Sequence, residues 1–423
     1  MENTSQRTFV EASVLIALAT LAEIGGRFLF PNGDVRYILY GIHSWILDQT
    51  IWMWESPGLN YYFGTLGALL NNPELAITLT GIGVNILASL TIWKLGNNFK
   101  SGRVATLSAA ACTALWFKPM VGGWLGDHVG FLIGTFPILL IYLNHGRLPW
   151  WTFGLTGVCI ATGLTLKLNN TGPGLALSCL WLLFLWWRLQ KDSTKSIPTF
   201  IKAFAYLLAG FIVTASLLQV TIPIEGGLYQ WILNFYSGVL RSDASSQFSL
   251  SKISQLPLQL NLIRAVQERQ LGVLIFIPLV IGFWTALAFN VTQLGSNRKE
   301  ILLKHSCALF LLVSSAVIGY GLARGVTHRI FLIPAGLIFS LPNGRTKAIQ
   351  STAAALTLAY MSTAFALFAH VQYSAEGFRE NLTARLNSNQ YLCIGDATPS
   401  PGALNNERQI TILRAEKISD KLD

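Results

Sequence analysis

Two aspartates lie beside long apolar segments of the chain and are the first candidates for chemistry. Asp34 follows the apolar segment at residues 10–30, and Asp127 directly precedes the one at residues 128–143. A carboxylate costs on the order of 2.5 to 3.5 kcal/mol at the centre of a bilayer and less near its surface. Either aspartate alone is equally well explained as a helix cap. For the two together we favour a function, because both stand at short loops that we place on one membrane face.

Basic residues near other segment ends are candidates for contacting a negatively charged substrate. The stretch ARGVTHR groups Arg324, His328 and Arg329, and the stretch LTLKLNNTGPG holds Lys167. Arginine and lysine are the usual protein partners of a phosphate. For a lone cation, contact with solvent or a lipid headgroup is the simpler interpretation, so the group of three is the stronger candidate. Glu55, just before a Pro-Gly break, is a further polar candidate.

The composition places these residues in a membrane protein. Of 423 residues, 52% are hydrophobic and 12% are charged, whereas a typical soluble domain has about 25% charged residues. Several windows without any charge approach the ~20 residues that a helix needs to cross ~30 Å of hydrocarbon. They include residues 75–93, 203–222, 271–291 and 348–369. Strand-length segments in which apolar and polar residues alternate, as in a membrane β-barrel, are absent. We therefore predict an all-α polytopic membrane protein.

We predict a bundle of about 11 transmembrane helices. They are placed at residues 10–30, 75–93, 104–117, 128–143, 149–166, 172–187, 203–222, 271–291, 305–323, 327–341 and 348–370. Basic residues gather in alternate short loops, above all at residues 94–103, 188–202 and 298–304. The positive-inside rule therefore puts the N terminus in the cytoplasm and both aspartates on the extracytoplasmic face.

The first outer loop, residues 31–74, is too apolar for an ordinary loop and too polar to cross a bilayer. Residues 35–48 carry polar side chains at helical intervals, which predicts an amphipathic helix lying in the membrane interface. Pro57 then breaks the chain, and we take residues 59–70 as a second short interfacial or re-entrant piece.

Motifs of several other protein classes are missing. Four of the five cysteines fall inside or at the edge of apolar segments and are expected to act as small apolar residues. No Cys-x-x-Cys or His-Glu-x-x-His spacing occurs, and no glycine-rich nucleotide loop follows a predicted strand. No basic stripe interleaved with aromatic residues suggests nucleic acid, so we interpret the net charge of +10 as mainly an orientation signal.

The order of these features resembles the GT-C fold of membrane glycosyltransferases, which take sugars from polyprenyl-phosphate carriers, and in particular the protein mannosyltransferases and aminoarabinose transferases. The matching pieces are Asp34 after the first span, the interfacial loop with ESPGLNYYFG at residues 55–64, GDH at residues 126–128, and LTLKLNNTGPG at residues 164–174. The resemblance covers about half the chain. Glu55-Ser56 replaces the basic residue and first proline that the family carries before its Pro-Leu pair, and the double acidic pattern of the second loop is reduced to Asp127.

The resemblance implies a reaction and roles for the candidate residues. Asp34 is the general base in an inverting attack, and Asp127 orients it or helps to hold a divalent cation, with His128 as a neighbour. Carboxylate ligands suit Mg²⁺ or Mn²⁺, and histidine admits Zn²⁺; no other cofactor is expected. Glu55 binds a sugar hydroxyl.

The resemblance also implies the partners and roles of the remaining candidates. Lys167, Arg324, His328 and Arg329 contact the phosphate of the polyprenyl-phosphate-linked sugar donor. The acceptor is a lipid, a glycan or a protein. The other partner is membrane lipid, and no nucleic acid is involved.

Three units follow from these interpretations. Residues 1–222 form a GT-C transmembrane module that includes the first-loop helices, residues 223–370 form a variable transmembrane module with a long outer loop at 223–270, and residues 371–423 form an extracytoplasmic tail. We expect a bacterial inner membrane rather than the endoplasmic reticulum. Alternatives are a lipid-linked polysaccharide polymerase or ligase and, ranked lower, a transporter or flippase. A flippase would need ionisable residues at mid-membrane depth, and Glu11 and Glu23 are almost the only ones.

Overall fold

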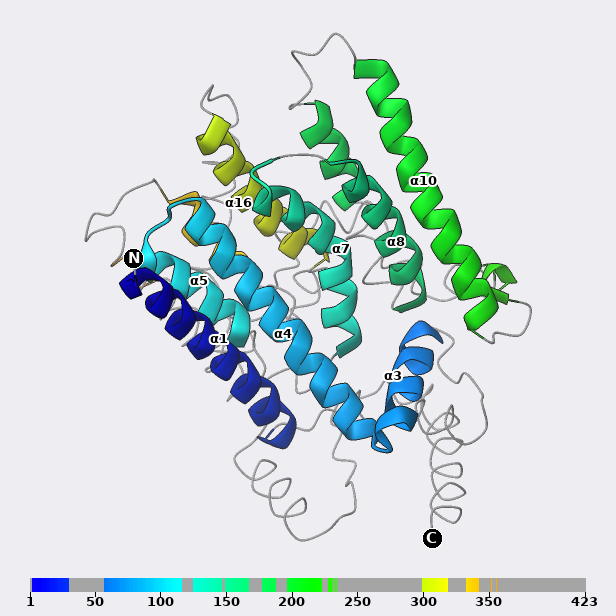
Figure 1. The fold of residues 1–423 in the computed structure, drawn as a ribbon, viewed down its shortest axis with the longest axis horizontal. Helices are drawn as coiled ribbons and strands as arrows, with labels where there is room; N and C mark the ends of the chain where they lie inside the picture. The colour runs from blue at the N-terminus through cyan, green and yellow to red at the C-terminus, as the bar shows by residue number, and fades with distance from the viewer. Residues whose placement is uncertain are drawn as a thin grey trace, which may run out of the picture.

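The computed structural model describes a helical protein (Figure 1). It describes residues 2–29, 57–115, 125–146, 149–166, 177–187, 196–222, 227–230, 233, 299–318, 332–341, 351 and 355. The helices are α1 (Glu2–Leu29), α3 (Pro57–Leu70), α4 (Pro73–Asn98), α5 (Arg103–Leu115), α7 (Leu125–Leu143), α8 (Trp150–Leu166), α10 (Ser196–Thr221), α16 (Lys299–Ile318) and α17 (Ile333–Ser340). A further apolar helix spans Leu177–Trp187. None of the described residues is in a β-strand.

The all-α prediction is confirmed for this part of the chain. Each span predicted before residue 223 contains a helix, and the short piece predicted after Pro57 is helix α3. Two described helical stretches, Leu75–Asn98 and Ile201–Thr221, are long and apolar enough to cross a membrane, which gives weak support to a membrane location. The predicted span at 271–291, most of that at 348–370 and the tail at 371–423 lie outside the described residues. The total of about 11 spans therefore stays a prediction.

Helix α4 begins and ends where its sequence dictates. The Asn72 side chain accepts a hydrogen bond from the backbone N–H of Leu75 at 3.0 Å, and Pro73 occupies the first helical turn. At the other end Lys100 adopts a left-handed backbone with φ of 54°, and the N–H of Ser101 donates to the carbonyl of Gly96 at 3.0 Å. Helix α5 starts directly afterwards, so α4 and α5 form a tight helical hairpin.

Helices α8 and α10 lie side by side (Figure 1) because glycines let their backbones approach closely. A Cβ atom on Gly157 would clash with the backbone of Leu207 and Phe211, and one on Gly210 would clash with the backbone of Gly154. Small residues at such a contact are typical of helix packing in membranes, where van der Waals contact drives association.

A polar network holds the centre of the bundle. The hydroxyl of Tyr142 on α7 donates to Ser306 Oγ on α16 at 3.1 Å and accepts from the indole N–H of Trp181 at 2.8 Å. Lys304 on α16 is also buried, and its ammonium group donates to the carbonyl of Leu341 at the end of α17 at 2.7 Å. These bonds satisfy buried donors at a helix end and across helix contacts.

In Figure 1 helices α4 and α7 run in the direction opposite to α1, α5, α8 and α10, so helix ends gather on two sides of the bundle. In Figure 1 the end of α1, all of α3, the beginning of α7 and the ends of α8 and α10 lie toward the lower side of the view. The N terminus and the hairpin between α4 and α5 lie on the opposite side. We call the lower side the α3 end of the bundle and the opposite side the N-terminal end.

Candidate functional site

The beginning of α3 packs against the end of α8. A Cβ atom on Gly58 would clash with the Thr165 side chain and lie 2.8 Å from its carbonyl oxygen, so only a glycine permits this approach. Burial raises the pKa of the Tyr62 phenol, one turn further along α3, and the side chain of Thr165 opposes that rise. Glu55 shortly precedes Gly58, and Lys167 shortly follows Thr165. The described neighbours of these two candidates are therefore in contact.

An apolar cluster packs against the tyrosines of α3 next to this contact. It joins the end of α8, the end of α10 and the short described segment after it, and its buried members are Ala161, Leu218, Ile222 and Leu228. Tyr61 and Tyr62 of α3 pack against it and meet each other edge to face with ring centroids 5.6 Å apart. Two tyrosines with an apolar body and a polar tip suit a wet, partly apolar site at a membrane surface.

Asp127 and His128 lie in the first turn of α7, at the same α3 end of the bundle (Figure 1). A carboxylate in the first turn complements the helix dipole, and the unpaired N–H groups of that turn attract anions. Helix α7 packs against α4 and α8, the same two helices that contact α3.

A buried asparagine ties together the helices that lead to both candidate aspartates. Asn85 of α4 is 1% exposed, and its Nδ2 donates to the carbonyl of Ala19 on α1 at 3.1 Å and to that of Ala114 on α5 at 2.6 Å. Ala114 is in the last turn of α5, whose carbonyls have no partner within the helix. Helix α1 leads along the chain to Asp34, and α5 leads to Asp127.

A buried carboxylate lies next to Asn85, on the side of the α3 end. Glu23 of α1 is 1% exposed, and its carboxylate lies so close to Gly81 of α4 that a Cβ atom there would clash with it. Gly81 and Asn85 are one helical turn apart on α4. Glu23 therefore faces the interior of the bundle.

The remaining predicted site residues lie outside the described residues. They are Asp34, Glu55, Lys167, Arg324, His328 and Arg329. For Asp127 and His128 the structure describes the backbone and not the side chains. Within the described part of the chain no group of three His, Cys, Asp or Glu converges to hold a metal ion. The metal site at Asp34, Asp127 and His128 stays a prediction, and no step proposed below depends on it.

Sequence reasoning missed Asn85 and the contact of Gly58 with Thr165. The signal for Asn85 was present, because an amide in the middle of the uncharged window 75–93 requires a buried partner. The Gly58 contact joins residues far apart in the chain, and a single sequence carries no signal for such a pair.

Comparison of the chain with protein-family models, with characterised proteins and with solved structures finds no match.

Proposed function

We propose that the protein is a polytopic membrane glycosyltransferase of the GT-C type, which moves a sugar from a polyprenyl-phosphate carrier to an acceptor at the extracytoplasmic face. The observation that carries the proposal is the contact of Gly58 and Tyr62 with Thr165 at the α3 end. Asp127 lies at that same end, in the first turn of α7 (Figure 1). Of the four segments that resemble parts of the GT-C fold, those at residues 55–64 and 164–174 contain the residues of this contact, and the one at residues 126–128 lies in the first turn of α7.

The proposed chemistry assigns one task to each kind of residue. Asp34 takes the proton from the acceptor hydroxyl as its oxygen attacks the anomeric carbon, and the bond from that carbon to the phosphate oxygen breaks. Lys167 and the group at Arg324 and Arg329 stabilise the negative charge of the departing polyprenyl phosphate. Asp127 orients Asp34 or the acceptor.

The described polar groups favour this enzyme over a transporter. Of the two acidic residues of α1 near the membrane interior, Glu11 is held by two arginines and a tryptophan, and Glu23 is wedged against α4. Both join helices to each other, whereas a translocation path needs ionisable groups that line a cavity. A polysaccharide polymerase or ligase shares the same donor chemistry and is separated from our proposal by its acceptor.

The test is turnover of defined polyprenyl-phosphate monosaccharides by the full chain in proteoliposomes, measured as released polyprenyl phosphate. We expect Asp34→Asn to lower the rate by at least about 100-fold, as loss of a general base does, and Asp127→Asn to lower it in the same direction. Asp192→Asn removes a carboxylate from a loop predicted on the opposite face and should leave turnover unchanged. All three variants keep the shape of the side chain and should insert normally.

Two outcomes would contradict the proposal. One is full turnover by both Asp34→Asn and Asp127→Asn in protein that has inserted and folded. The other is a wild-type chain that turns over none of the monosaccharide donors while remaining folded. A polymerase or ligase would instead release the carrier only when a lipid-linked glycan is supplied as the second substrate.

A further inference from the structure

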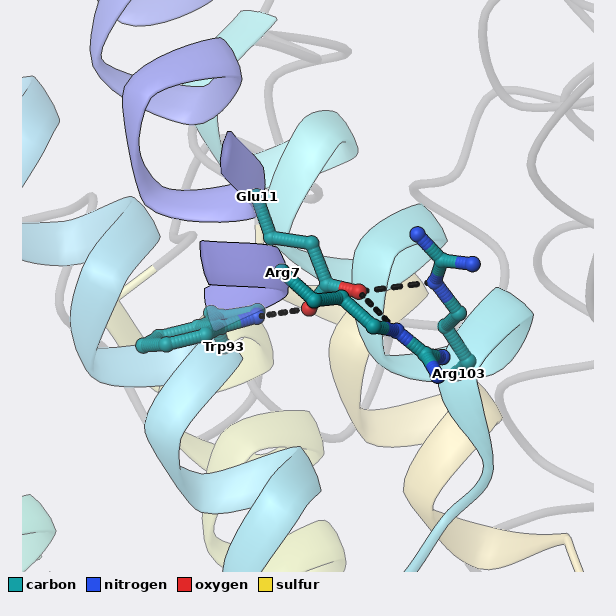
Figure 2. Close-up of polar contacts among 4 residues, drawn as sticks. All are labelled: Arg7, Glu11, Trp93 and Arg103. Carbon is teal, nitrogen blue, oxygen red and sulfur yellow. Dashed lines mark hydrogen bonds and ion pairs between the residues drawn. The ribbon is translucent and has the colours of Figure 1, made fainter. Parts of the chain in front are cut away.

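A carboxylate on α1 organises two arginines at the N-terminal end of the bundle. Oε1 of Glu11 accepts hydrogen bonds from Nε of Arg7 at 3.3 Å and from Nε of Arg103 at 2.7 Å. Its other oxygen, Oε2, accepts from the indole N–H of Trp93 at 3.2 Å (Figure 2). Three helices, α1, α4 and α5, therefore meet at this one side chain, and both carboxylate oxygens are in use.

The two guanidinium groups keep most of their donors available. Arg7 and Arg103 each use only Nε toward Glu11, and among the described residues no hydrogen bond involves their terminal nitrogens. Figure 2 shows both terminal groups turned away from the carboxylate. The side chains are 52% and 54% exposed. Two positive charges against one negative leave the cluster with a net positive charge and with donors fixed in direction.

Exposed apolar side chains flank the two arginines on both helices. Phe9 and Val10 on α1 are 73% and 52% exposed, and Val104 on α5, next to Arg103, is 42% exposed. A ligand that fits this surface combines an anionic group for the guanidinium donors with hydrocarbon for the apolar side chains. Each planar guanidinium group can donate two parallel hydrogen bonds to oxygens of a phosphate.

We propose that Arg7 and Arg103 bind the phosphate of an anionic glycerophospholipid whose acyl chains lie against Phe9 and Val104. The positive-inside orientation puts the N-terminal end of the bundle at the cytoplasmic leaflet, where anionic lipids attract basic residues near the membrane surface. Glu11 and Trp93 act as positioning residues. The Glu11 carboxylate holds together two guanidinium groups that would otherwise repel each other, and Trp93 holds that carboxylate in place. The site is independent of the proposed transfer reaction at the α3 end.

The test is native mass spectrometry of the full chain in detergent, titrated separately with phosphatidylglycerol, phosphatidylcholine and inorganic phosphate. We expect wild type to retain phosphatidylglycerol in preference to phosphatidylcholine. Arg7→Gln and Arg103→Gln should each weaken that binding about fivefold, and the double variant should lose the preference. Lys202→Gln is the matched control, since Lys202 is also exposed and stands between the exposed Ile201 and Phe204 but forms no ion pair or hydrogen bond through its side chain with a described residue.

A conservative variant keeps the test informative if charge removal harms folding. Arg7→Lys with Arg103→Lys retains both charges and loses the guanidinium geometry, so it should bind phosphatidylglycerol more weakly than wild type and more tightly than the double glutamine variant. Unchanged preference for phosphatidylglycerol in a folded double glutamine variant would overturn the proposal. Displacement of the lipid by equimolar inorganic phosphate would overturn it too, because the ligand would then be a free anion rather than a lipid.

Discussion

Replacing Asn85 by leucine tests whether this one amide joins three helices. The side chain is 1% exposed and donates two hydrogen bonds, to Ala19 and Ala114, each on a different helix. Leucine has a similar size and cannot donate, so the change removes both bonds and leaves little cavity. An interhelical hydrogen bond in a membrane contributes about 0.6 kcal/mol on average and up to about 1.7 kcal/mol. The two bonds together predict a loss of about 1–3 kcal/mol in the free energy of unfolding.

The measurement is unfolding of the purified protein in mild detergent as SDS is added, followed by far-ultraviolet circular dichroism. Asn97→Leu is the control, because Asn97 is exposed on the same helix and its side chain makes no hydrogen bond among the described residues; it should unfold like wild type. Ser89→Ala removes a single bond, from Ser89 Oγ to the carbonyl of Ala110 at 3.0 Å, and should fall between the two. Asn85→Asp should be worse than Asn85→Leu, since it sets an oxygen against two carbonyl oxygens.

The result that refutes the reasoning is an Asn85→Leu variant as stable as Asn97→Leu. The amide would then be buried without holding the helices together, and the link it makes between α1 and α5 would carry no free energy. A loss equal to that of Ser89→Ala would show that only one of the two bonds contributes.

The remaining predictions use pairs of glycines. Gly157→Ala should lower the free energy of unfolding by about 1–3 kcal/mol by overpacking against the α10 backbone. Gly154→Ala should be tolerated, since its Cβ atom would lie 3.8 Å from the nearest carbonyl oxygen. If the two variants lowered the stability in SDS equally, the close packing of Gly157 against α10 would be contradicted. Gly81→Ala should displace the Glu23 carboxylate and destabilise the protein, whereas Gly83→Ala meets no atom within 4 Å and should be neutral or slightly stabilising because alanine is the better helix former. The same unfolding assay compares these two variants. A Gly81→Ala variant as stable as Gly83→Ala would contradict the close packing of the Glu23 carboxylate against Gly81.

The positions of the described helices could be predicted from the sequence because local signals mark them. The uncharged window at 75–93 ends in polar residues on both sides, and Asn72-Pro73 has the pattern of a helix start. The break at Pro57 likewise predicted a short interfacial or re-entrant piece, and the structure has helix α3 there. These signals depend only on residues close together in the chain, so they do not require knowledge of the tertiary contacts.

Partners across helices could not be predicted in the same way. Lys304 counted toward the basic residues of an inner loop, yet it lies within α16, and its ammonium group donates to the end of α17. A charge count does not distinguish a solvated lysine from one that binds the last carbonyl of another helix. The contact of Glu11 with Arg103 joins two helices whose register no local pattern specifies. Most of the candidate site residues lie outside the described residues. The structure therefore bears on the site chiefly through residues that are next to the candidates in the sequence.

Four buried polar side chains of the described bundle make hydrogen bonds that bear on function. Asn85, Ser89, Ser178 and Lys304 each donate to a backbone carbonyl on another helix. Carbonyls within a helix cannot move independently, so these bonds hold the helices in one arrangement. A transporter must exchange interior contacts as it alternates between two states, whereas an enzyme with its site at one end needs a fixed scaffold beneath it. These interior contacts therefore support our proposal of an enzyme with its site at the α3 end rather than a transporter.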